Sequence, residues 1–357
     1  LPAGVAGAIV SVQDYNNTFD TNNLTIDPNG SEKINGGDAG LALTLSTEGQ
    51  GLTLVYIDAT VGWRSVHSDD FSQVPQTPAF VTATGGTITT VCTDYKVHTF
   101  TGPGTFCVSC AGNPTGSALV DYLVVAGGGS GGNDAGGGGG AGGFREGYNP
   151  GSYTASPLAT TALPVSATGY SIVVGSGATN PGSPQSAGTQ GSNSSFSTII
   201  STGGGAGAFP GVGGSGGSGG GSTGVCNSGG AGNTPPVSPS QGNPGGTSVP
   251  GGGSGGGGAG ATGTPGAGAS GGNGVTTSIN ASPVIRAGGG GGGYNSPGIG
   301  GDGGTGGGGT GGARCSGAAG SGTVNTGSGG GGSGGGPANA DAGSGGSGIV
   351  IIRYKFQ

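Results

Sequence analysis

Few side chains in this sequence could carry out acid–base or nucleophilic chemistry. There are two histidines, His67 and His98, and either one could in principle serve in a Ser–His–Asp arrangement. The adjacent acids Asp69 and Asp70 could suggest the paired carboxylates of glycoside hydrolysis. We interpret the histidines as structural or surface residues, and the two acids as solvated side chains of a polar segment. The sequence therefore predicts a protein that is not an enzyme.

The cysteines could form a metal or redox site. Cys107 and Cys110 have the two-residue spacing of many zinc ligands, but no second pair has this spacing. On an extended strand, residues three apart face opposite sides, which spoils a shared site. We expect a packing role, or a disulfide from Cys92 to Cys107 or Cys110. Because there are five cysteines, at least one stays unpaired within the chain.

Composition excludes several classes of ligand. Matches to Gly-x-Gly-x-x-Gly are expected by chance where 100 of 357 residues are glycine, and none lies in a βαβ unit that could bind a dinucleotide. The net charge is −7 and the eight basic residues are scattered, whereas nucleic-acid binding needs a basic cluster. No segment approaches the about 18 apolar residues of a membrane helix. We expect no nucleic-acid partner, no membrane insertion and no cofactor.

Residues 1–68 predict a small N-terminal β module. Its apolar side chains alternate in short segments separated by Asn- and Gly-rich turns, at residues 8–12, 25–26, 41–45 and 52–57. Trp63, the single tryptophan, is predicted to anchor the packing. A module this small buries little apolar surface alone, so we expect oligomerisation to complete its core. Residues 69–88, which contain Pro75 and Pro78, read as a linker.

Residues 89–357 predict a glycine-rich β-sandwich domain. Strands are expected at residues 87–91, 95–100, 104–109, 120–125, 170–174, 195–200, 283–285 and 349–356. A hairpin is expected across Thr101, Gly102, Pro103 and Gly104. No helix is expected, because interior glycines each cost about 1 kcal/mol relative to alanine. The fold class is therefore all-β.

The glycine runs lie within residues 127–348, between two strand-like segments that hold their ends. They occupy residues 127–143, 203–221, 251–260, 288–293, 298–312 and 327–336. They could be flexible loops, since glycine loses the most backbone entropy on ordering. They could instead form extended left-handed polyglycine II helices that pack side by side through backbone hydrogen bonds. The repeated run length and the strand islands between runs favour the packed helices.

The larger side chains among the glycines are expected at the connecting tips of the runs. Loops on a rigid scaffold are where binding residues concentrate. The expected tips are residues 144–148 with Tyr153, residues 209–210, 234–236 and 294–297. The predicted receptor-binding side chains are Phe144, Arg145, Tyr148, Tyr153, Phe209, Tyr294 and Asn295.

Three segments resemble the glycine-rich domain of bacteriophage tail-fibre and adhesin proteins: residues 121–129 (DYLVVAGGG), 140–147 (GAGGFREG) and 345–354 (GGSGIVIIRY). Residues 18–26 (TFDTNNLTI), 54–56 and 62–63 resemble a module of marine cyanophage tail fibres. The resemblance implies a virion protein that recognises a bacterial surface receptor, either a glycan or an outer-membrane protein. It also implies a fibrous homotrimer that assembles with other phage tail proteins.

Two other functions are compatible with the sequence. The chain could be a structural filament or cell-surface protein whose glycine region forms a matrix, with the N-terminal module making head-to-tail contacts. A glycan depolymerase would be the third, and it would depend on Asp or Glu residues. The acidic balance, the β modules and the absence of a catalytic set favour receptor binding without catalysis.

Overall fold

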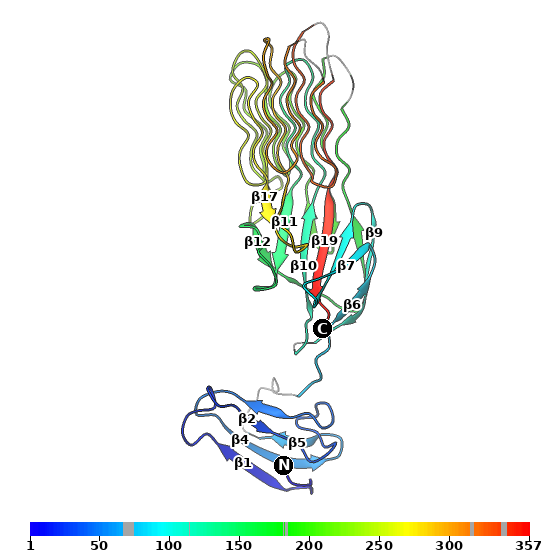
Figure 1. Ribbon diagram of the computed structural model, residues 1–357, viewed down its shortest axis with the longest axis vertical. Helices are drawn as coiled ribbons and strands as arrows, with labels where there is room; N and C mark the ends of the chain where they lie inside the picture. The colour runs from blue at the N-terminus through cyan, green and yellow to red at the C-terminus, as the bar shows by residue number, and fades with distance from the viewer. Residues whose placement is uncertain (67–74, 114, 181, 183–184, 315–317, 337–340) are drawn as a thin grey trace. The chain divides into compact units, whose positions relative to one another are not determined.

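A computed structural model describes residues 1–66, 75–113, 115–180, 182, 185–314, 318–336 and 341–357. Every regular element among these residues is a β-strand, which confirms the all-β fold (Figure 1). The chain forms two compact units, Leu1–Ala79 with Gly112–Gly116, and Phe80–Ala111 with Ser117–Gln357. The candidates His67, Asp69, Asp70 and Cys315 lie outside the described residues.

The N-terminal unit contains two small antiparallel sheets. One sheet has the order β1 (Ile9–Gln13), β4 (Gly51–Asp58), β5 (Gly62–Ser65), and the other pairs β2 (Leu24–Ile26) with β3 (Leu43–Leu45). Trp63 is fully buried among aliphatic side chains, and its Nε1 donates a hydrogen bond to Glu32 Oε2 at 3.0 Å. The predicted anchoring role of this tryptophan is confirmed.

The second unit contains a β-sandwich, as predicted. One sheet has the strand order β12 (Ala159–Thr161), β11 (Phe144–Tyr148), β10 (Leu119–Val125), β19 (Ile349–Lys355), β8 (Tyr95–Phe100), β7 (Thr87–Val91), with β13 (Leu163–Pro164) also paired to β10. The other has the order β16 (Ile199–Ser201), β15 (Ser194–Phe196), β14 (Gly169–Val173), β9 (Gly104–Ala111), β6 (Val81–Thr84). Aromatic side chains including Phe106, Tyr122 and Phe196 fill the space between the sheets.

The central strands β10 and β19 are buried on both faces. Val124 and Ile352 point into the core between the sheets, whereas Leu123 and Ile351 belong to a second apolar cluster. That second cluster includes residues next to the hairpin of β17 (Val275–Thr277) and β18 (Val284–Arg286). Burial on both faces explains why these two strands are continuous apolar runs rather than alternating ones.

Three local predictions about the sandwich are wrong. β8 and β9 do not form a hairpin, because β8 pairs with β7 and β19 while β9 pairs with β6 and β14. The chain changes sheet at the predicted turn, so that Phe100 and Phe106 both enter the core between the sheets. The expected linker at residues 69–88 is too long, because it contains β6 with its buried Val81 and Ala83. The expected strand at 195–200 is the β15–β16 hairpin, which turns at Ser197 with φ 53°.

The glycine runs extend beyond the ends of the sandwich strands and lie side by side (Figure 1). Their backbone hydrogen bonds repeat with a period of three residues. Gly127, Gly128 and Gly129 donate to three different segments, at Ser192, Gly346 and Gly140. The next three residues return to the same segments in the same order, because Ser130, Gly131 and Gly132 donate to Thr189, Gly343 and Gly137. This run is therefore hydrogen-bonded on three sides.

The runs approach one another too closely for side chains at most interior positions. A Cβ atom at Gly131 would lie 2.0 Å from the carbonyl oxygen of Gly331, and one at Gly290 would lie 2.0 Å from that of Gly330. Such distances are far below van der Waals contact, so the packing itself requires glycine. Where other residues occur inside the runs they are small, such as the buried Ser130, Ala141 and Ser254.

A buried polar cluster lies on the face of β10, β11 and β19 that points away from the five-stranded sheet. Asp121 accepts hydrogen bonds from the Asn149 N–H at 2.6 Å and the Ser152 hydroxyl at 2.9 Å. Glu146 accepts from the Tyr153 hydroxyl at 2.8 Å, from the Ser156 N–H at 2.9 Å and from the Thr277 hydroxyl. The two carboxylates thus fasten residues 149–156 and the β17 strand to the sheet.

Arg353 completes this cluster. Its guanidinium donates to the carbonyls of Ile279 and Ser152 and lies 4.2 Å from the ring centroid of Tyr95. Burial raises the pKa of Asp121 to about 6, although its two hydrogen-bond donors and the nearby Arg353 lower it. Ionising Asp121 in the folded protein is therefore costly.

Replacing Gly290 by alanine should destabilise the second unit. The new methyl group would overlap the Gly330 carbonyl, and overpacking of this kind costs about 1–3 kcal/mol of unfolding free energy. Gly102, in the β8–β9 connection, is the matched control because a Cβ there would have no neighbour within 4 Å. Urea denaturation should show a clear loss for Gly290→Ala and a change within about 0.5 kcal/mol for Gly102→Ala. Equal effects would contradict the close packing.

Asp121 should make stability depend on pH. Because its pKa in the folded state, about 6, is higher than the ordinary 3.8, its contribution is fully present below pH 4 and is lost as pH rises through 6. The difference corresponds to about 3 kcal/mol. Unfolding free energies measured between pH 4 and 7 should fall more steeply in the wild type than in Asp121→Asn, which cannot ionise. Parallel profiles for the two proteins would show that the burial of Asp121 has no such effect.

Candidate functional site

His98 is a core residue of the sandwich. Its Nδ1 lies 2.7 Å from the Gly85 carbonyl oxygen and its Nε2 lies 3.0 Å from the Tyr354 hydroxyl. Both ring nitrogens are occupied by these partners, and the ring packs edge-on against Phe106. Burial lowers the pKa of His98, which favours the neutral imidazole. The structural interpretation of this histidine is confirmed.

The cysteine prediction is wrong for the cysteines that the structure describes. Cys92, Cys107 and Cys110 are free and exposed, as is Cys226, so they form neither the expected disulfide nor part of the core. On β9 the core positions are taken by Phe106 and Val108, which leaves Cys107 on the solvent side. Within the described residues, no three His, Cys, Asp or Glu side chains lie close enough together to hold a metal ion.

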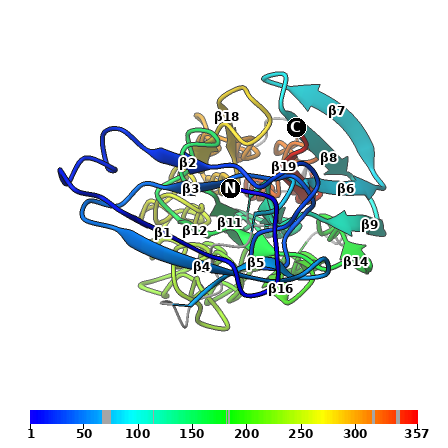
Figure 2. The same cartoon turned by 90° about the horizontal axis from the view of Figure 1, so that it is seen from below.

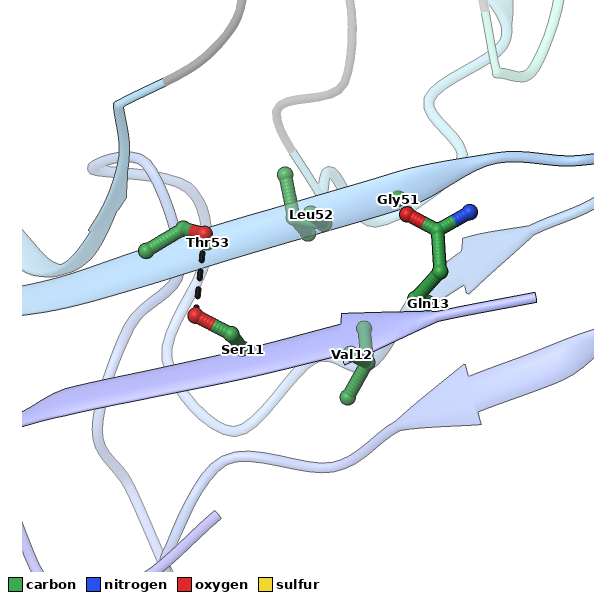
Figure 3. Close-up of a pocket in the computed structure, with 6 residues that line it drawn as sticks. All are labelled: Ser11, Val12, Gln13, Gly51, Leu52 and Thr53. Carbon is green, nitrogen blue, oxygen red and sulfur yellow. Dashed lines mark hydrogen bonds between the residues drawn. The ribbon is translucent and has the colours of Figure 1, made fainter. Parts of the chain in front are cut away.

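A shallow hollow on the N-terminal unit lies between β1 and β4 (Figure 3). The side chain of Gln13 extends over Gly51, and the hydroxyls of Ser11 and Thr53 are 2.9 Å apart. Its other lining residues are Val12 and Leu52. Because none of these side chains is charged or carries an imidazole, the hollow offers no general acid or base and no charged metal ligand.

Four of the predicted binding residues lie in the sandwich and not at run tips. Phe144, Arg145 and Tyr148 belong to β11, where Phe144 is paired with Val125 and is only 1% exposed. Tyr153 is half-buried against the polar cluster, and burial together with Glu146 raises its pKa. The predicted tip location is wrong for this segment, because its backbone pairs with β10 as soon as the glycine run ends. The predicted tip at residues 234–236 is also wrong: Gln241 links it to Thr202 beside the strands.

The course of the first glycine run, residues 127–143, shows where the connecting tips lie. This run leaves β10, turns at Asp134 and Ala135, which have φ of 54° and 56°, and returns to β11. This turn therefore lies at the end of the runs farthest from the sandwich strands, and we call that end the distal end (Figure 1). The Thr223 hydroxyl donates to the Ala135 carbonyl, and Thr223 bridges to Gly211 and Gly253.

Phe209, Tyr294 and Asn295 lie at the distal end. Phe209 precedes Gly211 by two residues, and Tyr294 forms an isolated bridge with Gly252. Asn295 is exposed and its N–H donates to the Gly251 carbonyl at 2.9 Å. The structure thus brings these three predicted residues to one end of the molecule's second unit and separates them from the four in the sandwich.

Sequence reasoning missed three exposed apolar side chains at the same end. Val212, Val225 and Ile299 are 63%, 69% and 85% exposed. Val212 directly follows Gly211, and Val225 lies two residues after Thr223, so these two lie on neighbouring tips. In the sequence, each of these three is a single aliphatic residue next to glycine and outside any strand pattern. This isolation is the signal that the side chain would stay exposed. Exposed apolar groups gathered in one region are typical of an interaction surface.

The glycine-rich domain family matches residues 101–355, which is most of the chain. The chain belongs to the glycine-rich domain family. This glycine-rich domain contains all the runs and all seven predicted binding residues, whereas nearly all of the N-terminal unit lies outside it. The comparison with curated proteins gives no match.

Among the residues that the structure describes, no helix could span a lipid bilayer.

The site that the geometry favours is the distal end of the glycine-rich domain. It offers apolar and aromatic side chains with a few polar groups, such as Asp134 with its partner Gln185. Such a surface can bind another molecule, but it holds no arrangement for acid–base chemistry among its described residues.

Proposed function

We propose that the protein is a non-enzymatic phage tail-fibre protein that attaches the virion to a bacterial surface receptor. In this proposal the distal end of the glycine-rich domain makes the contact. The observation that carries it is the placement of Phe209, Tyr294 and Asn295 beside exposed aliphatic residues at the free end of the runs. The sequence resemblance to phage adhesins supplies the virion context and the bacterial receptor, either a glycan or an outer-membrane protein.

We infer that the runs are polyglycine II helices. A helix with three residues per turn would direct successive N–H groups to three sides and return to the first side at the fourth residue. The hydrogen-bond partners of residues 127–132 follow this order. Packed helices of this type would hold the tips in fixed positions. Binding would then lose less free energy to the ordering of loops.

The partners in this proposal are the bacterial receptor, other phage tail proteins and further copies of the chain. The homotrimer is proposed from the resemblance, and it would also complete the small core of the N-terminal unit. The second candidate is a structural filament protein. The observation that favours it is the glycine framework itself, whose hydrogen bonds are satisfied without a ligand.

Substitutions at the distal end should weaken binding to bacterial cells. We expect the triple variant Phe209→Ala, Tyr294→Ala, Asn295→Ala to lose at least about tenfold in affinity, since truncating a few central contacts typically costs 1–2 kcal/mol or more. Fluorescently labelled protein can be titrated onto susceptible cells, and competition with phage adsorption gives a second readout. Ile200→Ser is the matched control, because Ile200 is an exposed apolar residue of the sandwich.

The control should bind like the wild type, and all three proteins should have similar melting temperatures. Wild-type protein that neither binds cells nor blocks adsorption would contradict receptor recognition. If the wild-type protein does not bind cells and forms filaments without other phage components, the result would support the structural filament protein.

A further inference from the structure

We propose that β7 is an assembly edge through which two copies of this chain pair antiparallel, joining their seven-stranded sheets into one continuous sheet. β7 is the last strand of its sheet and lies at the outer margin in Figure 2. Residues Thr87, Ile88, Thr89 and Thr90 are all exposed, so both faces of the strand as well as its edge are open. Ile88, which would face the core if the second sheet extended this far, is 44% exposed.

The direction of the backbone groups of β7 follows from the neighbouring pairings. The Phe356 N–H donates to the Asp94 carbonyl, and β8 pairs with β19 in the same register, with Lys96 opposite Tyr354. Hydrogen-bonded pairs alternate along an antiparallel ladder, so the even-numbered residues of β8 bond to β19. The odd-numbered residues of β8 therefore bond to β7. Thr89, opposite Val97, therefore bonds inward. Ile88 and Thr90 direct their N–H and C=O groups outward.

Nothing in β7 protects this edge. Natural edge strands are usually blocked by a charge, a proline, a bulge or a covering segment. β7 reads Thr-Ile-Thr-Thr-Val, contains no charge and no proline, and pairs with β8 in an unbroken register. No described segment of the chain pairs with its outer side. An uncharged, β-branched strand of this kind is well suited to accept another strand.

The strand is complementary to a second copy of itself. In the antiparallel register centred on Thr89, each outward-bonding Ile88 meets the outward-bonding Thr90 of the other copy. Two hydrogen-bonded pairs form, and the two Thr89 residues face each other directly between them. No charged side chain of β7 meets another, because β7 has none. This self-complementarity identifies β7 of a second copy as the occupant of the edge, related by a two-fold axis. The contact is thus separate from the three-fold contacts of the proposed homotrimer, and it would join chains of two trimers.

The register makes a cysteine cross-link specific. Opposed residues of a non-hydrogen-bonded pair have Cα atoms about 4.5 Å apart, which suits a disulfide. Thr89→Cys should give a covalent dimer on a non-reducing gel after mild oxidation, in a yield several-fold above that of the wild type with its native cysteines. Thr87→Cys is the matched control, since Thr87 is also exposed but faces Val91 of the other copy in this register.

A second variant keeps the test independent of cysteine reactivity. Thr90→Pro removes an outward N–H without breaking a bond to β8, so the melting temperature should change little. Combined with Thr89→Cys, it should abolish the specific cross-link and lower the mass of the intact particle in light scattering. Equal cross-linking at positions 87 and 89, or a particle mass unaffected by Thr90→Pro, would overturn the proposal.

Discussion

Main-chain hydrogen bonds between glycine runs are the interaction on which the second unit depends. They join segments far apart in the sequence, such as Gly131 to Gly343 and Gly290 to Gly139. These bonds form because the backbones approach until a Cβ atom would overlap a carbonyl group. The peptide groups in these bonds have partners that a flexible loop would have to take from water. These closely spaced bonds and contacts offset the large conformational entropy that the glycine backbone loses on folding.

The sandwich makes this arrangement possible by fixing where each run begins and ends. β10 and β19 are buried on both faces, and their pairing sets Val125 opposite Ile349 at the point where two runs meet the sheet. The buried carboxylates of Asp121 and Glu146 hold the segments that follow β11 and the β17–β18 hairpin against the same sheet. The sandwich thus serves as a foundation, and its side chains are remote from the proposed binding surface.

The sequence predicts the elements whose local pattern is sufficient. β10 and β19 are predicted correctly, because a long apolar segment rich in β-branched residues and bordered by glycine is typical of a buried strand. The sequence does not predict β6 and β11, because these segments become strands only through pairing with distant partners. Phe144 and Tyr294 show the same limit: each directly follows a glycine run, yet Phe144 pairs with Val125 in the sheet while Tyr294 lies at the distal end. Composition alone does not show that the first glycine run turns at Asp134. The tip is therefore predicted at residues 144–148, where the run has already returned to the sheet.

The central claim is that the glycine runs form an ordered hydrogen-bonded framework that presents the distal end. Amide hydrogen–deuterium exchange on the intact protein, followed by peptide mass analysis, tests it most directly. Interior runs such as residues 136–143 and 288–293 should be protected to a degree comparable with β10 and β19, while the exposed turn at residues 294–298 should exchange faster. Exchange of the interior runs at the rate of an unstructured peptide would contradict the account.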